Sequence, residues 1–594
     1  MLLLLGALAC TPRAAPPEPA AQEVSLNDDA TAGVTDPALR QLLHDHWEAD
    51  MRRWPRWATR MGDHRYDHLL EDISPEASQA AQDEAEAMLA RARALGDLNP
   101  ADAVTRELLV FSLQSDVDSE VCRMDQWNVL LYSNLINSLN RLPEVHPLIT
   151  PEGGDSYVAR LRAMPALLDA RAANLRAGLA EGRVANAETL RRMVALIDAQ
   201  LALPVSEWPL AVPAADERVG WPPEREAAFR EAVLIEITDG VAPALTRLRD
   251  TMEGELLPRA RTGRDVGLTG VPDGAACYAT QIRRYTTLSL DPDAVHQTGL
   301  EELARVHADM RALGAEVLGT DDLARIFARL REDPALRFTS AEEILETARS
   351  ALSRAGAATP RILKAPPDAQ CVVTEVPPLD APYTTIAYYR PPRNDGSPGE
   401  YVVNTSAPTT RARYEAEALA FHESIPGHHL QNALSRELPD TPAFRRTLNL
   451  SAFGEGWALY SERLADELGL YTGPIDRLGM LAFDAWRAAR LVVDTGIHHQ
   501  GWSREDAVAF MLENTALAPT NVDNEVDRYI SWPGQALSYK IGQLEVLAIR
   551  ADAEAALGPA FDLPAFHDRL LGRGAVTLPM LREDVEAWVE TQAP

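Results

Sequence analysis

Cysteine is scarce in this chain of 594 residues, of which only four are cysteine. Cys122, Cys277 and Cys371 lie far apart in the sequence, without the spacing of a metal site, and no activation motif surrounds any of them. At most one disulfide can form among these three, and we expect all of them to have core positions. A cysteine nucleophile is therefore not expected.

Positive charge is also in short supply, because the formal net charge is −31 at pH 7 and no long basic run occurs. A nucleic-acid partner is excluded on this ground, since phosphate binding needs clustered lysine and arginine. Long apolar runs are missing as well. Beyond the first ten residues no segment is long and apolar enough to span a bilayer.

The N-terminus carries a short apolar run, Leu2–Leu5, followed by small residues and Cys10. This pattern is similar to the end of a bacterial lipoprotein signal, and we predict residues 1–10 as a signal peptide with a lipid on Cys10. Residues 11–35 are rich in proline and alanine and are predicted to be a flexible tether. The protein would then face the periplasm, lipid-anchored or secreted, with no other membrane contact. The alternative is a cytoplasmic protein with a frayed apolar tail.

Helical periodicity dominates the rest of the chain, with the clearest amphipathic patterns at 76–95 and 157–201. Residues 36–594 contain no interior linker, low-complexity run or obvious repeat, which predicts a single, mainly α domain. Alternating segments predict short strands at 371–376, 384–390 and 401–405, with a hairpin turn at 394–399. This small sheet ends just before the main motif, so it could pair with a substrate backbone or simply cap the helices.

The main motif begins with His422 and Glu423. A zinc hydrolase uses such a pair inside a helix, because the histidine binds the ion and the glutamate acts on water. The second ligand normally lies four residues on, where this chain has Pro426. A regular helix would place His428 about 120° around the axis from the first histidine. We predict that Pro426 and Gly427 break the helix and let His428 return to the site.

A third ligand is predicted at Glu455, in a second helical segment that can return antiparallel to the first. Its flanking glycines would leave room for an ion. We predict one zinc per chain, bound by His422, His428 and Glu455. His429 is the alternative second ligand, or a packed histidine. Glu462 shares a helix face with Glu455 and could accept a hydrogen bond from a ligand imidazole, or could be a solvated surface residue.

These segments carry a family resemblance. The sequence resembles the bacterial domain-of-unknown-function family 885 (DUF885) in stretches that cover nearly the whole chain after the tether: 57–66, 277–300, 422–431, 453–460, 490–498 and 533–542. That family is grouped with helical zinc peptidases such as thimet oligopeptidase, carboxypeptidase Taq and angiotensin-converting enzyme. The resemblance implies a clam-shaped helical fold with a deep cleft. It implies no settled substrate.

Further candidates lie near the C-terminus. A hydrated peptide carbonyl needs a hydrogen-bond donor opposite the zinc, and late tyrosine or histidine residues fill this role in related helical peptidases. Tyr529, Tyr539 and His498 are the candidates here, by order along the chain. Arg528 and Lys540 could bind a substrate carboxylate and favour carboxypeptidase-like trimming. Alternatively, they pair only with the nearby acids Asp523, Glu525 and Asp527.

The function predicted from the sequence is zinc-dependent hydrolysis of peptide bonds in short peptides of the cell envelope, with Glu423 as general base. A closed cleft would exclude folded proteins from the metal. Two alternatives stay open at this point. The same site could hydrolyse a non-peptide amide or ester, or the protein could be a metal-free peptide-binding lipoprotein.

Overall fold

The computed structural model describes residues 26–131, 134–377, 381, 386–392 and 396–592. The predicted signal peptide, Cys10 and most of the tether lie outside these residues. The folded domain was predicted to start at residue 36, and helix α1 (Leu26–Ala30) lies before that position. Asp29 of this helix forms an ion pair with Arg446, and Val34 is buried. The end of the proposed tether is therefore part of the fold.

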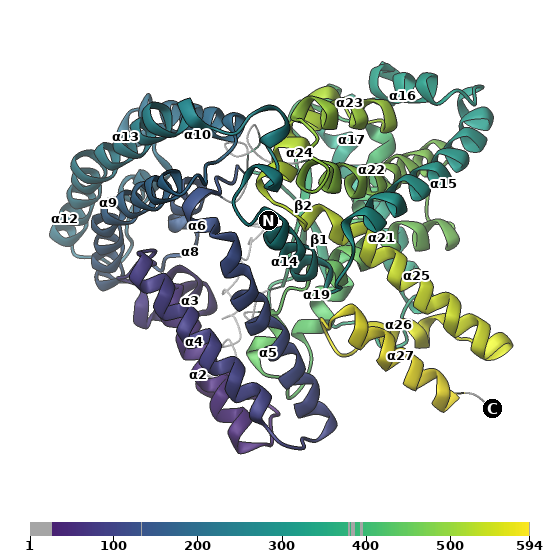
Figure 1. Cartoon of the computed structure of the whole chain (residues 1–594), viewed down its shortest axis with the longest axis horizontal. Coiled ribbons are helices and arrows are strands. Elements are labelled where there is room, and N and C mark those ends of the chain that lie inside the picture. The colour runs from purple at the N-terminus through teal and green to yellow at the C-terminus, as the bar shows by residue number, and fades with distance from the viewer. Residues whose placement is uncertain (1–25, 132–133, 378–380, 382–385, 393–395, 593–594) are drawn as a thin grey trace, which may run out of the picture.

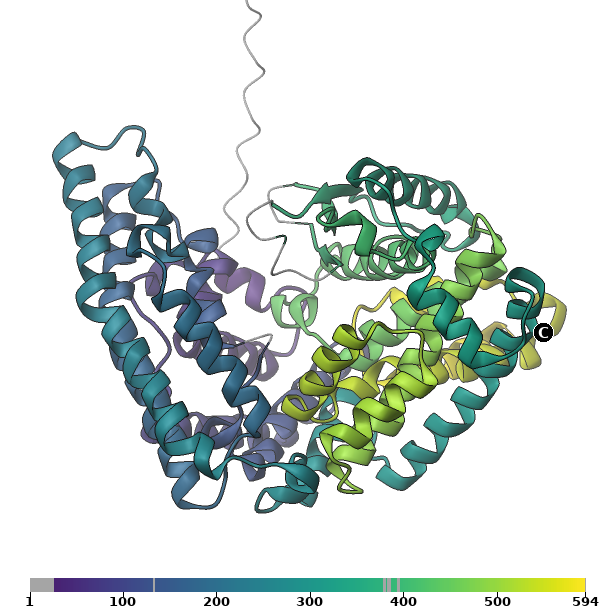
Figure 2. The same cartoon turned by 90° about the horizontal axis from the view of Figure 1, so that it is seen from above.

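The fold is mainly α-helical with one small sheet, as the sequence predicts. Residues 129–256, here called the arm, have an apolar core of their own. Figure 2 shows the arm and the C-terminal helices diverging from a common base, with the arm in blue. The remaining residues, here called the body, share two other large cores. The described residues therefore contain three large apolar cores, one in the arm and two in the body.

The helices of the arm follow those of the N-terminal part of the body along the chain (Figure 1). The N-terminal helices are α2 (Pro37–Arg53), α3 (Pro55–Met61), α4 (Pro75–Ala94), α5 (Pro100–Ser119) and α6 (Met124–Trp127). The arm contains α7 (Leu135–Asn140), α8 (Leu142–Val145), α9 (Pro151–Ala180), α10 (Ala187–Leu201), α11 (Val212–Ala215), α12 (Pro223–Ile235) and α13 (Ala242–Asp250). The helices predicted at 76–95 and 157–201 are confirmed as α4 and as the pair α9 and α10. The second prediction spans two helices because the Asn186 side chain caps a new one.

The rest of the body contains the helices from α14 to α27. They are α14 (Gly274–Thr286), α15 (Pro292–Leu318), α16 (Leu323–Glu332), α17 (Ala341–Ala358), α18 (Ala416–Glu423), α19 (His428–Arg436), α20 (Ala443–Thr447), α21 (Ser451–Glu467), α22 (Pro474–His498), α23 (Arg504–Asn514), α24 (Pro519–Ser531), α25 (Ser538–Leu557), α26 (Leu563–Leu571) and α27 (Leu578–Gln592). Helix α22 is buried along nearly its whole length and packs on α15. A Cβ atom at Gly299 of α15 would lie 2.7 Å from Val492 of α22, so glycine allows this close approach.

The sheet has three strands in the order β1-β3-β2: β1 (Cys371–Glu375), β2 (Ala387–Arg390) and β3 (Gly399–Val403). Strands β2 and β3 are antiparallel, with Tyr389 opposite Tyr401, which confirms the predicted hairpin. Its predicted turn lies partly outside the described residues. Strand β1 adds to β3 in parallel. Tyr401 in the central strand is buried against the core that also contains α18.

Cys122 and Cys277 form a disulfide that links the end of α5 to α14, and Cys371 is a free, partly buried thiol. This single disulfide agrees with the prediction that at most one can form among the three cysteines. Among the helices that the structure describes, none combines the length and the apolar character needed to cross a bilayer.

Candidate metal centre

The break between α18 and α19 forms as the sequence predicts. Helix α18 ends at Glu423, and α19 begins at His428. A Cβ atom at Gly427 would lie only 1.9 Å from the His422 carbonyl oxygen, so glycine is required for this close turn. The Trp457 indole N–H donates to the carbonyl oxygens of Pro426 and Gly427, at 2.9 and 3.2 Å, and holds the turn in place.

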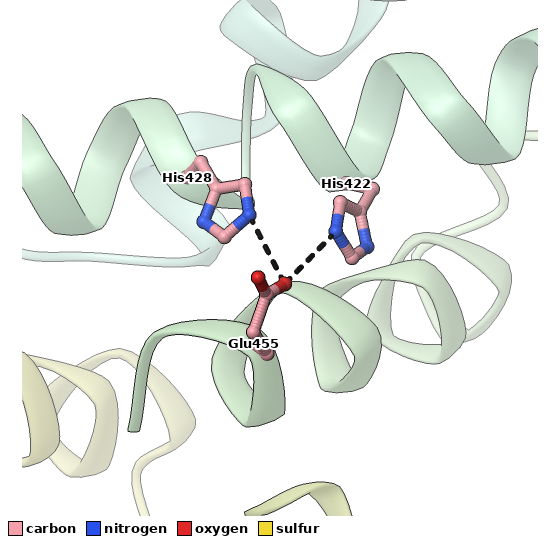
Figure 3. Close-up of side chains that lie close together, drawn as sticks. All are labelled: His422, His428 and Glu455. Atoms are coloured by element: carbon pink, nitrogen blue, oxygen red, sulfur yellow. Dashed lines mark ion pairs between the residues drawn. The ribbon is translucent and has the colours of Figure 1, made fainter. Parts of the chain in front are cut away.

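Three side chains converge at this turn (Figure 3). Glu455 Oε2 lies 3.6 Å from His422 Nε2 and 3.5 Å from His428 Nε2. All three ligand atoms lie within 4.8 Å of one another. Two donors bound tetrahedrally to one zinc, each about 2.0–2.1 Å from it, are roughly 3.3–3.5 Å apart. The two imidazoles and the carboxylate therefore form a donor set suited to zinc, and both histidine–carboxylate distances are close to this spacing.

Glu455 is positioned by close packing of α21 against α25. A Cβ atom at Gly456 would lie 2.5 Å from backbone atoms of Gly542 in α25, so two glycines face each other here. Gly456 was predicted to leave room for an ion, and in the structure it allows the close approach of helix α25. The same contact brings Tyr539 of α25 close to the site.

Glu462 is buried and accepts a hydrogen bond from His422 Nδ1 at 2.8 Å. This bond fixes the proton on Nδ1 and leaves Nε2 of His422 free to bind a metal. The other oxygen of Glu462 is buried without a hydrogen-bond partner. Glu462 is therefore an orienting acceptor and not a solvated surface residue.

Electrostatics at the centre favour a cation. Burial lowers the pKa of His422, but its contacts with Glu455 and Glu462 outweigh burial and raise that pKa to about 9. Burial raises the pKa of Glu455, yet hydrogen bonds from His422 and His428 hold it well below its usual range. The carboxylates thus stabilise positive charge at the position where a divalent ion would lie.

Glu423 is the last residue of α18 and lies beside the three converging side chains. Its carboxylate has no hydrogen bond or ion pair with any residue that the structure describes. Burial raises the pKa of Glu423, and the nearby His422 and His428 oppose this shift. A half-buried, unengaged carboxylate next to the ligands is available to exchange a proton with water.

His429 points away from this cluster. Its Nε2 lies 3.0 Å from the Ala369 carbonyl oxygen and therefore carries the proton. Its Nδ1 then accepts a hydrogen bond from the Tyr389 hydroxyl at 3.1 Å. Both ring nitrogens are used to tie α19 to the sheet, so the structure favours His428 over His429 as the second ligand.

The predicted oxyanion donors separate into one that lies at the centre and two that do not. The Tyr539 ring stacks on His422 with the ring centroids 6.5 Å apart, and burial raises its pKa, so its hydroxyl keeps a proton to donate. The Tyr529 hydroxyl is already engaged, since it accepts from Trp486 and Arg490 and donates to the Glu525 carboxylate.

His498 does not reach the centre, contrary to the sequence-based prediction. Its Nδ1 accepts from the Leu268 N–H at 3.2 Å, and its Nε2 donates to the Tyr529 carbonyl oxygen at 2.9 Å. No ring nitrogen is left for a substrate oxygen. The sequence around His498 does not reveal these two backbone partners, because they come from other segments of the chain.

The predicted substrate-binding cations are also largely engaged. Lys540 is fully buried and binds the carboxylates of Asp484 and Glu302 at 2.6 and 2.9 Å, so it is unavailable to a substrate. Arg528 pairs with Glu525 at 2.8 Å and donates to a glutamine side chain. The pairing of Arg528 with Glu525 agrees with the alternative prediction that these cations pair with nearby acids.

Comparison with known proteins identifies the family. The sequence model of the family described as "Bacterial protein of unknown function (DUF885)" matches residues 55–585. The chain belongs to DUF885. No curated protein matches it by sequence. The predicted resemblance is therefore confirmed, and the site described above lies within the matched region.

Among solved structures, this DUF885 chain is similar to a protein described as a "putative lipoprotein" from Colwellia psychrerythraea. The two are 26% identical with a TM-score of 0.88, over 94% of this chain and 100% of that one. A "putative lipoprotein of unknown function" from Shewanella oneidensis is 19% identical with a TM-score of 0.72, over 92% and 98% of the chains. An M32 carboxypeptidase from Deinococcus radiodurans R1 is 14% identical over 93% and 96%, with a TM-score of only 0.40.

Sequence reasoning missed two arginines of α22 in this DUF885 chain. Arg487 and Arg490 are 4% and 3% exposed, and their guanidinium carbons lie 5.9 and 4.3 Å from the centroid of the Tyr539 ring. Their spacing of three residues within an otherwise apolar helix was the available signal. A buried face with two arginines needs a chemical reason.

Proposed function

We propose that this protein is a zinc-dependent peptidase of the cell envelope that acts on short peptides. The observation that carries the proposal is the convergence of His422, His428 and Glu455, with the unengaged Glu423 beside them. Three protein ligands that leave a fourth position open are typical of catalytic zinc sites.

The residues divide the work of peptide hydrolysis as follows. When bound, zinc supplies Lewis acidity toward a substrate carbonyl and toward water. Glu423 takes the proton of the attacking water and passes it to the leaving amine. Glu462 holds the His422 ring in the orientation in which Nε2 faces the ligand group. The Tyr539 hydroxyl donates a hydrogen bond to the oxygen on which negative charge develops.

The envelope location in this proposal rests on two features. The N-terminal segment resembles a lipoprotein signal, and the similar protein from Colwellia psychrerythraea is described as a putative lipoprotein. A disulfide between Cys122 and Cys277 is in keeping with an oxidising compartment such as the periplasm.

The test uses purified protein, its Glu423→Gln variant and a library of short peptides. We expect about one zinc per chain in both proteins by elemental analysis, because Glu423 is not a ligand. We expect peptide cleavage by the parent and a loss of at least about 100-fold in kcat for the variant, since removal of a general base typically costs this much or more. Full activity of the zinc-loaded variant would refute the mechanism. Absence of metal in both would favour a peptide-binding lipoprotein.

A further inference from the structure

Helix α22 carries a stripe of polar side chains on an otherwise apolar, buried surface. Asp484, Arg487, Arg490, Asp494 and His498 recur three or four residues apart and therefore lie on one face. All five side chains are at most 4% exposed. Four of them have partners: Lys540 for Asp484, Glu525 for Arg490, Tyr278 for Asp494, and backbone groups of Leu268 and Tyr529 for His498. Arg487 has none.

The guanidinium of Arg487 is buried without an ion pair or hydrogen bond to any described residue, and its Nε and Nη1 atoms are orphaned. Aromatic rings surround it, with their centroids 4.6 Å (Phe483), 4.1 Å (Trp486) and 5.9 Å (Tyr539) from its central carbon. These ring faces stabilise the positive charge. They do not satisfy in-plane N–H donors, and buried donors of this kind are normally paired.

Two further arginines, Arg490 and Arg528, belong to the same cluster as Arg487. Arg490 and Arg528 each have one further buried nitrogen without a hydrogen-bond partner. Both pair with the same carboxylate, that of Glu525, at 3.0 and 2.8 Å. Glu525 thus forms ion pairs with Arg490 and Arg528 but not with Arg487. Burial lowers the pKa of Arg487, and the Glu462 carboxylate is the strongest influence that opposes this shift.

This cluster adjoins the metal centre through Tyr539. The Tyr539 ring stacks on the ligand His422 at 6.5 Å and lies beneath the guanidinium of Arg490 at 4.3 Å, with Arg487 at 5.9 Å. The unpaired N–H donors of Arg487 and Arg490 are therefore separated from the ligand His422 by the ring of Tyr539. Planar guanidinium groups match a carboxylate, which can accept two parallel hydrogen bonds.

We propose that Arg487, assisted by Arg490, binds a carboxylate of the peptide substrate beside the metal centre. This inference rests on the proposed peptidase function and names its substrate class. The carboxylate comes either from the peptide C-terminus, which makes the enzyme a carboxypeptidase, or from an acidic side chain near the scissile bond. Lys540 and Arg528, the cations suggested by the sequence, are not needed, because acids already occupy them.

The kinetic test compares otherwise identical peptides with a free or amidated C-terminus, each with Glu or Gln as the penultimate residue. The variants are Arg487→Gln, the charge-conserving Arg487→Lys, and the control Arg477→Gln, an exposed arginine of the same helix that pairs with Asp466. We expect kcat/KM to fall on the order of 100-fold in Arg487→Gln for the peptide that carries the recognised carboxylate. Cleavage of the matched neutral peptide and zinc content should stay the same, and Arg487→Lys should retain part of the activity.

A terminal carboxylate is identified if amidation removes the effect, and a side-chain carboxylate if Glu→Gln removes it. If the parent enzyme cleaves all four peptides equally, the proposal is overturned. It is also overturned if Arg487→Gln lowers cleavage of every peptide alike or lowers zinc content. That result would assign Arg487 to positioning Glu462 and the metal centre.

A binding test does not depend on turnover. In the Glu423→Gln background the same peptides are titrated by calorimetry, with and without Arg487→Gln. We expect the carboxylate-bearing peptide to bind on the order of 100-fold more tightly than its neutral counterpart, and this preference to disappear in the double variant. Equal binding of the two peptides would overturn the carboxylate site. Preferential binding without hydrolysis by the parent would instead refute the peptidase function and leave this site standing.

Discussion

Replacement of His428 and of the adjacent His429 by alanine should have opposite effects on zinc and on stability. His428 Nε2 faces the Glu455 carboxylate at 3.5 Å, whereas both nitrogens of His429 bind groups outside the cluster, Ala369 and Tyr389. Structural zinc sites with four ligands bind with apparent free energies of about 10–16 kcal/mol, or roughly 3 kcal/mol per ligand. Loss of one ligand should therefore weaken zinc binding on the order of 100-fold.

For His429→Ala the expected loss is in folding. Two hydrogen bonds disappear and leave a carbonyl and a hydroxyl without their partner, which costs about 2–3 kcal/mol in the free energy of unfolding. Zinc affinity is measured by competition with a chromophoric chelator, and stability by urea unfolding of the metal-depleted proteins. His428→Ala should weaken zinc binding and change the stability of the metal-free protein little. If His429→Ala is the variant that loses zinc while His428→Ala keeps it, the ligand assignment is wrong.

Three further predictions concern Tyr539 and Glu462 at the metal centre and the buried His567. Tyr539→Phe keeps the ring that stacks on the ligand histidine and should lower kcat about 100–1000-fold at unchanged zinc content; a normal kcat would exclude the hydroxyl as oxyanion donor. Glu462→Gln should weaken zinc binding about 10–100-fold, whereas Glu467→Gln, an exposed acid of the same helix, should have no effect. Burial lowers the pKa of His567 to about 3, so its stabilising contribution is complete above pH 6.5 and is lost as pH falls from there toward 3. Between pH 7 and 5 the free energy of unfolding should fall by about 2 kcal/mol more in the parent than in His567→Gln. Replacement of the exposed His499 by Gln is the control. Equal pH dependence of the parent and His567→Gln would refute this prediction.

The sequence by itself determined the elements and the centre of the site. Helical periodicity predicted α4, and the alternation in β2 and β3 predicted their hairpin, because these patterns depend on which neighbouring residues share a face. The approach of His428 to His422 was predictable for a similar reason. Pro426 and Gly427 interrupt a helix at a known place, so local geometry alone indicates that His428 can turn back toward His422.

Only the tertiary structure decided the roles of the residues around that centre. Whether Lys540 or His498 is free depends on partners such as Asp484 and Leu268, which lie tens or hundreds of residues away in the sequence. A polar side chain has the same appearance in the sequence whether it is satisfied or not. Among the described residues Arg487 lacks the hydrogen-bond or ion-pair partner that each other member of its stripe has. The sequence does not show this difference, because hydrogen bonding and burial are set by packing between distant segments.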